Sequence, residues 1–235
     1  MTGLKLTGLL AAAALLVAVS TFTVQSTDAP PVSFDGLHLH TGAKVAIAYV
    51  KPEADFSVYN EFIMLDTYVA FKKNWQRDTK VAGRRVSNKD MERIKTEAAE
   101  LLRDTFKNEL DEKGGYKFVT TAADNVLLLR PALIDLEITA PDINTPGRVT
   151  QYVASAGAAT LYLEMYDSVS GEILARVVDR RRMQDYGTAR WATSVSNRAE
   201  AQRMFRRWAE LLRAGMDEVR ADAGLAPMLP VEPAS

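Results

Sequence analysis

The side chains best suited to acid–base chemistry are carboxylates on or beside predicted strands: Asp66, Asp135, Glu137, Asp167 and Asp179. A glycosidase-like reaction needs two carboxyl groups about 5–10 Å apart across a cleft. Asp135 and Glu137 would share one face of a strand. The apolar residues between and around them, Ile134, Leu136 and Ile138, indicate by their alternation that this face is the outer, solvated one. A carboxylate-dependent hydrolase is therefore the alternative interpretation, and we assign no catalytic residue.

Metal and cofactor chemistry find little support. The chain has two histidines, His38 and His40, and no cysteine. On a strand the two histidines would face the same side, as a metal pair does, but no third ligand is fixed by spacing. Lack of cysteine excludes disulfides, thiolate nucleophiles and Cys-ligated zinc. Neither GxxxxGKS/T nor GxGxxG occurs. We expect two surface histidines, no metal site and no cofactor.

Two tryptophans outside the helical apolar stripes are candidates for binding. Trp75 lies in KKNWQRD and Trp191 in ARWATS, each beside an arginine. Tryptophan and arginine are enriched at protein interfaces. The predicted interaction surface consists of Trp75, Arg77, Asp78, Arg190 and Trp191. The same residues also suit a second role, in which tryptophan covers the edge of a sheet.

A run of three arginines, Arg180, Arg181 and Arg182, follows a predicted strand. Such a run could contact anionic headgroups at a membrane surface. Asp179 and Asp185 flank it, so a solvated strand end with local salt bridges is the simpler interpretation. The formal net charge of the whole chain is -1, which gives no reason to expect nucleic-acid binding.

Two long amphipathic helices must position these residues. The first is predicted over Ser87–Lys113, with Ser87 and Asp90 in a capping-box pattern and Gly114 and Gly115 at its end. The second is predicted over Asn197–Ala223, with Asn197 as its cap. Each carries about seven apolar side chains at spacings of three and four.

About five strands complete the fold. They are predicted at Lys44–Val50, Phe62–Phe71, Asn125–Thr139, Ala156–Asp167 and Glu172–Asp179, the last two forming a hairpin around Ser168–Gly171. Pro131 indicates a bulge or an edge within its strand. Because predicted strands neighbour one another along the chain, we expect a mostly antiparallel or mixed sheet with two helices packed on it, an α+β fold.

The ends of the chain differ in composition from the middle. Lys5 precedes the apolar run GLLAAAALLVAV, and small residues follow at Ala18 and Ser20, or at Val24 and Ser26. This pattern is typical of a cleavable signal peptide, expected over residues 1–26, because the run is short for a membrane span. A single domain is expected over residues 34–223. Residues 224–235, rich in proline, are expected to form a flexible tail.

Five segments resemble a known family in order along the chain. They are YVKPEADFSVY, VAFKKNWQRD, ADNVLLLRPALIDLEITAPD, LYLEMYDSVSGEILARVVDR and RWATSVSNRAEAQRMFRRWAELL. They are similar to a bacterial cell-envelope family, the domain of unknown function numbered 3313, over about Phe34 to Val219. The resemblance implies an exported protein without an established activity. Many members are lipoproteins, whose anchor needs a cysteine at the cleavage site. Because this chain has none, we expect release into the periplasm.

The preferred functional interpretation is a non-enzymatic interaction or structural module of the bacterial envelope, with an unidentified envelope protein as its partner. The carboxylate-dependent hydrolase and a small-ligand or lipid carrier are the alternatives. A close carboxylate pair in a cavity would favour the enzyme. A closed apolar cavity would favour the carrier, and an aromatic groove or free strand edge would favour the module.

Overall fold

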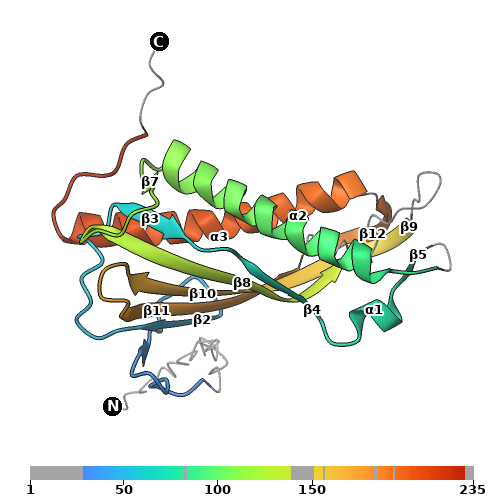
Figure 1. The fold of residues 1–235 in the computed structure, drawn as a ribbon, viewed down its shortest axis with the longest axis horizontal. Helices are drawn as coiled ribbons and strands as arrows, with labels where there is room; N and C mark the ends of the chain where they lie inside the picture. The colour runs from blue at the N-terminus through green and yellow to red at the C-terminus, as the bar shows by residue number, and fades with distance from the viewer. Residues whose placement is uncertain are drawn as a thin grey trace, which may run out of the picture.

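The computed structural model describes residues 29–81, 84–138, 151–155, 157–182, 185–192 and 194–230. In these residues a mixed sheet carries the two long helices α2 and α3 on one face (Figure 1). The predicted α+β class is confirmed. The predicted number of elements is wrong, because this sheet has eight strands rather than about five. A third, four-residue helix, α1 (Trp75–Asp78), is present in addition to the two long helices. The additional strands are too short to produce a clear period-two signal.

The strand order of the large sheet is β1-β2-β11-β10-β8-β3-β7, and β4 pairs with β8. Its strands are β1 (His38–Leu39), β2 (Ile47–Val50), β3 (Glu61–Met64), β4 (Tyr68–Phe71), β7 (Lys117–Phe118), β8 (Val126–Ile138), β10 (Gly157–Asp167) and β11 (Ile173–Arg182). Two smaller sheets pair β5 (Lys80–Val81) with β6 (Arg84–Arg85), and β9 (Gln151–Ser155) with β12 (Asp185–Ala192). The predicted hairpin is the pair β10 and β11.

The single strand expected over Phe62–Phe71 is wrong, because the chain forms two strands there. Both run parallel to β8: Met64 is opposite Leu129, and Tyr68 is opposite Ala132. The Leu65 amide donates to the Leu129 carbonyl at 2.9 Å. Residues two apart on a strand direct their backbone groups to the same neighbouring strand. Pro131, two residues after Leu129, therefore directs its backbone toward the point where β3 ends and β4 has not yet begun. Because proline has no N–H, this break leaves no donor of Pro131 unpaired.

A bulge does interrupt β8, but at Asp135 rather than at Pro131. Ile134 is opposite Thr160 and Glu137 is opposite Ala158, so β8 carries one extra residue. Asp135 has a φ of 49°, a left-handed conformation that aspartate tolerates better than most residues. Consequently Leu136 faces the helices as expected, whereas Ile134 lies opposite Thr160 on the other face.

Helix α2 (Asn88–Lys107) begins as predicted. The Ser87 hydroxyl accepts a hydrogen bond of 3.1 Å from the Asp90 amide, which satisfies one of the free donors at a helix start. The helix continues as a five-residue π-helix, η1 (Asn108–Glu112). Gly115, with a φ of 75°, follows it.

Helix α3 (Ser194–Asp222) begins three residues before the predicted start. Asn197 therefore lies inside the helix and does not cap it. The apolar stripes of α2 and α3 pack on the sheet in one core that includes Leu102, Phe106, Phe205, Trp208, Leu129 and Leu163. Each buried side chain contributes about 1.5–3 kcal/mol, so the stripes hold both helices on this face.

Part of the predicted tail contacts the domain. Gly224 follows α3 with a φ of 71°. The Arg220 guanidinium then donates to the Ser57 carbonyl and to the Ala226 carbonyl, each at 3.2 Å. Leu229 approaches Gly115 so closely that a β-carbon at Gly115 would lie 2.1 Å from the Leu229 carbonyl oxygen. The mobility of residues 224–235 stays a prediction, and residues 231–235 lie outside the described ranges.

The predicted signal peptide, residues 1–26, also lies outside the described ranges. Within those ranges, none of the helices combines the length and the apolar character that crossing a bilayer requires.

Candidate functional site

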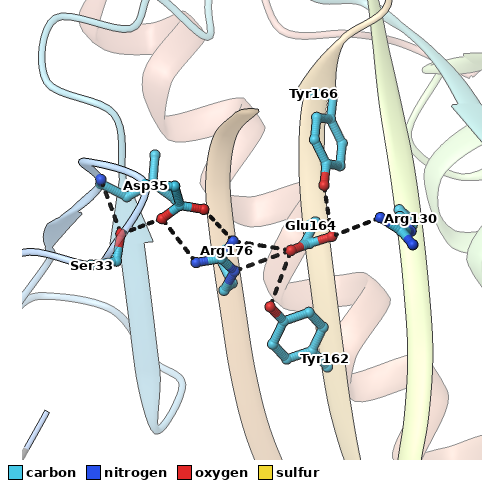
Figure 2. A network of polar contacts seen from close by, with 8 residues as sticks. Ser33, Asp35, Arg130, Tyr162, Glu164, Tyr166 and Arg176 are labelled. Atoms are coloured by element: carbon cyan, nitrogen blue, oxygen red, sulfur yellow. Dashed lines mark hydrogen bonds and ion pairs between the residues drawn. The ribbon is translucent and has the colours of Figure 1, made fainter. Parts of the chain in front are cut away.

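A connected group of polar side chains lies on the sheet face opposite the helices. Glu164 on β10 is directly opposite Arg176 on β11. Their sequence neighbours Leu163 and Ala175 belong to the helix-side core, so alternation directs Glu164 and Arg176 to the other face. Nε of Arg176 donates to Oε1 of Glu164 at 3.2 Å (Figure 2).

Glu164 and Arg176 belong to what we call the sheet-face network: Ser33, Asp35, Arg130, Tyr162, Glu164, Tyr166 and Arg176 (Figure 2). Tyr162 donates to one oxygen of Glu164 at 3.0 Å and Tyr166 to the other at 2.7 Å. The guanidinium of Arg130 lies 3.6 Å from the second oxygen. Arg176 also donates to Asp35 at 3.1 Å, so the network links the N-terminal segment to β11, β10 and β8.

The protonation states of this network suit a structural role. The pKa of Asp35 is lowered from 3.8 to about 2, chiefly by the hydrogen bond from Arg176. Burial raises the pKa of Glu164, but hydrogen bonds from Tyr166, Arg176 and Tyr162 outweigh burial and leave it below 4.5. A general acid at neutral pH needs the opposite shift. Both carboxylates are therefore ionised and engaged with partners.

Three of the carboxylates singled out in the sequence, Asp66, Asp167 and Asp179, have partners in the structure. Asp179 is 6% exposed and accepts hydrogen bonds from Trp208, Arg181 and the Ala46 amide. Asp167 accepts from the Ser170 amide at 2.7 Å, which fixes the β10–β11 turn. The fully exposed Asp66 pairs with Arg103 at 2.6 Å.

Asp135 and Glu137, the strand pair considered for a hydrolase, differ in their surroundings. Asp135 is exposed at the bulge. Glu137 is bound by Arg180 at 2.6 Å and by Lys72 at 3.2 Å. Burial raises the pKa of Glu137, and these two cations outweigh burial so that it lies below 4.5. Glu137 is thus an ion-pair acceptor at neutral pH.

A cavity of about 360 Å³ opens where β4 leads into α1. We call it the lysine cavity, and its lining residues are Lys72, Lys73, Trp75, Asp78, Thr79, Lys80, Glu137 and Ile138. Two of the five residues predicted to form the interaction surface, Trp75 and Asp78, line it. The three lysines were not among the predicted residues, although the adjacent lysines of VAFKKNWQRDTK are visible in the sequence. Glu137 was considered only as one half of a carboxylate pair.

Trp75 acts mainly as a structural wall of this cavity. It is 7% exposed, stacks on Phe71 with ring centroids 4.2 Å apart, and donates from Nε1 to the Ile138 carbonyl at 3.2 Å. These contacts match the second role considered for it, covering the sheet edge. Beside it, Arg77 and Asp78 are exposed and form an ion pair of 2.9 Å.

Arg190 and Trp191 lie on β12, opposite Val153 and Tyr152 of β9. Their side chains lie outside the described part of the structure. Trp75, Arg77 and Asp78 thus lie on one short helix, α1, and the interaction surface of the five residues stays a prediction.

The arginine run lies inside β11 rather than after it. Because side chains alternate along a strand, the three arginines do not form one continuous patch. Arg181 faces the helix side and pairs with Asp179 at 2.7 Å, whereas Arg180 faces the other side and pairs with Glu137. Arg182 is exposed. Arg180 thus links the run to the lysine cavity through Glu137.

The chain belongs to the family described as protein of unknown function (DUF3313), whose model matches residues 32–212. The resemblance drawn from the five sequence segments is thereby confirmed. No curated protein matches the chain.

Solved structures similar to this chain are distant. The PelC dodecamer from Paraburkholderia phytofirmans shares 11% identity with a TM-score of 0.34, covering 71% of this chain and 96% of that one. Protein XCC0632 from Xanthomonas campestris shares 10% identity with a TM-score of 0.38, covering 74% of this chain and 93% of that one.

Proposed function

We propose that this protein is an exported, non-enzymatic interaction module of the bacterial envelope, and that it binds its partner at the lysine cavity and the adjoining Arg77–Asp78 corner. The observation that carries the proposal is the cavity itself. It has a volume of about 360 Å³, is lined by Trp75 and Asp78, and combines an aromatic wall with three lysines. Binding sites commonly unite such an apolar wall with a few placed polar groups.

The non-enzymatic part of the proposal is supported by the state of the carboxylates. Asp35, Glu137, Glu164 and Asp167 all have a lowered pKa. Each is held by hydrogen bonds or ion pairs, and none of these four is poised to donate a proton at neutral pH. Among the described residues, these contacts stabilise the sheet, and this supports a structural role for the four carboxylates rather than the acid–base pair of a carboxylate-dependent hydrolase.

The localisation part is supported by the sequence alone. Lys5, the apolar run that follows it and the small residues near Ser20 and Ser26 are typical of a cleavable signal peptide. The chain has no cysteine for a lipid anchor. Release into the periplasm would bring the lysine cavity to partners in that compartment.

In-cell photocrosslinking tests the proposal. A photoreactive amino acid replaces Lys73 at the cavity or, as control, Lys117 on β7, which lies near the opposite end of the sheet from α1 (Figure 1). We expect a discrete crosslinked product from position 73 and none from position 117, in a periplasmic fraction that contains the chain without its leader. Crosslinking that is equal at both positions, or a cytoplasmic chain with its leader intact, would refute the proposal.

A further inference from the structure

The lysine cavity concentrates positive charge at one corner of a nearly neutral chain. Five cationic side chains line or adjoin it: Lys72, Lys73, Lys80, Arg77 and Arg180. Two carboxylates, Asp78 and Glu137, face them. The corner therefore carries a formal charge of about +3, whereas the whole chain has a net charge of -1.

The ion pairs use only some of these cations. Arg180 and Lys72 share Glu137, at 2.6 Å and 3.2 Å. Arg77 is matched by Asp78. Lys73 and Lys80 have no ion-pair partner in the described part of the chain, and both are exposed. Two ammonium groups at the cavity are therefore available for an external anion.

From this arrangement we infer that the lysine cavity binds a phosphate group. Lysine ammonium groups are common phosphate ligands, because each supplies a full charge and three donors. Lys73 precedes α1 in the chain and Lys80 follows it, and both line the cavity. Thr79 lines the same cavity, and a threonine hydroxyl can donate a hydrogen bond to a phosphate oxygen.

The dimensions and walls of the cavity suit a small phosphorylated group. A volume of about 360 Å³ lies at the lower end of the usual range for ligand sites, roughly 300–1,000 Å³. Ile138 and Trp75 line the cavity beside the lysines and add apolar character to its wall. This combination fits a phosphate ester whose organic part lies against Ile138. The ester is either a soluble phosphomonoester or the headgroup of a phospholipid.

This inference rests on the proposed function, because it names the ligand chemistry of the same contact surface. It also gives the predicted membrane contact of Arg180 a physical basis. Arg180 holds Glu137 by an ion pair and thereby keeps a carboxylate from repelling the phosphate. Arg181 contributes nothing here, since it pairs with Asp179 on the helix side.

Two binding measurements on the purified mature chain test the inference. In the soluble arm, glycerol 3-phosphate is titrated by calorimetry, with glycerol and sodium sulfate as comparison ligands at constant ionic strength. In the membrane arm, the chain is sedimented with vesicles of phosphatidylcholine containing phosphatidylglycerol, and with phosphatidylcholine vesicles alone. Binding of glycerol 3-phosphate identifies a soluble ester, and binding of only the anionic vesicles identifies a lipid headgroup.

The variant is Lys73→Gln/Lys80→Gln, which removes both unpaired ammonium groups. The matched control is Lys107→Gln/Lys117→Gln, which changes the net charge equally at two exposed positions outside the cavity. Removing two cations from a phosphate site should weaken binding about tenfold or more, while the control should retain the affinity of the wild type. Circular dichroism checks that both variants remain folded.

Several outcomes would overturn the inference. The first is that neither glycerol 3-phosphate nor the anionic vesicles bind. The second is that both variants weaken binding equally, since attraction would then depend on total charge. The third is that sulfate competes as well as the phosphate ester. A crosslinked partner at position 73 without phosphate binding would leave the proposed interaction module standing and reject only the phosphate ligand.

Discussion

The indole nitrogen of Trp208, on α3, donates a hydrogen bond of 2.8 Å to Oδ2 of Asp179, on β11. Both residues are buried, at 2% and 6% exposure. The same carboxylate accepts from Arg181 at 2.7 Å and from the Ala46 amide at 2.9 Å. One carboxyl group thus joins the long C-terminal helix, the strand that carries the arginine run and the entry to β2. A buried charge is tolerated when several donors satisfy it in this way.

Replacing Trp208 by phenylalanine should destabilise the fold by about 1.5–3 kcal/mol, because it removes a hydrogen bond to a buried charge and retains most of the ring packing. Urea unfolding followed by circular dichroism measures the loss. Trp75→Phe is the matched control: its indole donates to the neutral Ile138 carbonyl at 3.2 Å, so about 0.5–1.5 kcal/mol is expected. A larger loss at Trp75 than at Trp208 would contradict this account.

Arg176→Met should cost about 3 kcal/mol or more of unfolding free energy, since it leaves the buried Glu164 without its strand neighbour and releases Asp35. Arg180→Met provides the comparison on the same face of the same strand. The side chain of Arg180 is 40% exposed and its ion pair with Glu137 is at the surface, so its loss should cost less than about 1 kcal/mol. Equal effects in chemical denaturation would show that the sheet-face network does not stabilise the fold.

The loss of folding stability at low pH should depend on the protonation of Asp35. The pKa of Asp35 is lowered from its ordinary value of 3.8 to about 2 in the folded chain, chiefly by the hydrogen bond from Arg176, so the folded state binds fewer protons in this range than the unfolded state. The stabilisation is present above pH 3.8 and is lost as the pH falls through about 2. Unfolding free energies measured across this range should decline less in Asp35→Asn than in the wild type. Asp66→Asn, at a fully exposed carboxylate, should leave the decline unchanged, and an equal change in both variants would count against the assignment.

Gly115→Ala should release the C-terminal tail. A methyl group at this position would lie 2.1 Å from the Leu229 carbonyl oxygen, and the φ of 75° disfavours any side chain. Gly171→Ala is the matched control. Its φ of 70° gives the same backbone cost, about 1–2 kcal/mol, but nothing lies within 4 Å of the added carbon. Hydrogen exchange at residues 225–229 should accelerate in the first variant and remain at the rate of the wild type in the second. Unchanged exchange in Gly115→Ala would show that the tail does not depend on this contact.

The sequence by itself determined the local features of this protein. Ser87 and Asp90 predicted the start of α2, Gly114 and Gly115 predicted its end, and Ser168–Gly171 predicted the turn between β10 and β11. These features depend on residues that lie a few positions apart, such as a cap and the amide that it accepts from. Patterns of this range can be read directly from the order of amino acids.

Only the tertiary structure decided which distant residues meet. It divided Phe62–Phe71 into β3 and β4 because both pair with β8, more than sixty residues away in the chain, and it placed the bulge at Asp135. It matched Glu164 with Arg176 and brought Lys80 to the cavity that Glu137 also lines. Strand register and ion-pair choice depend on contacts between separated segments, and the periodicity of a single segment contains no information about its neighbour.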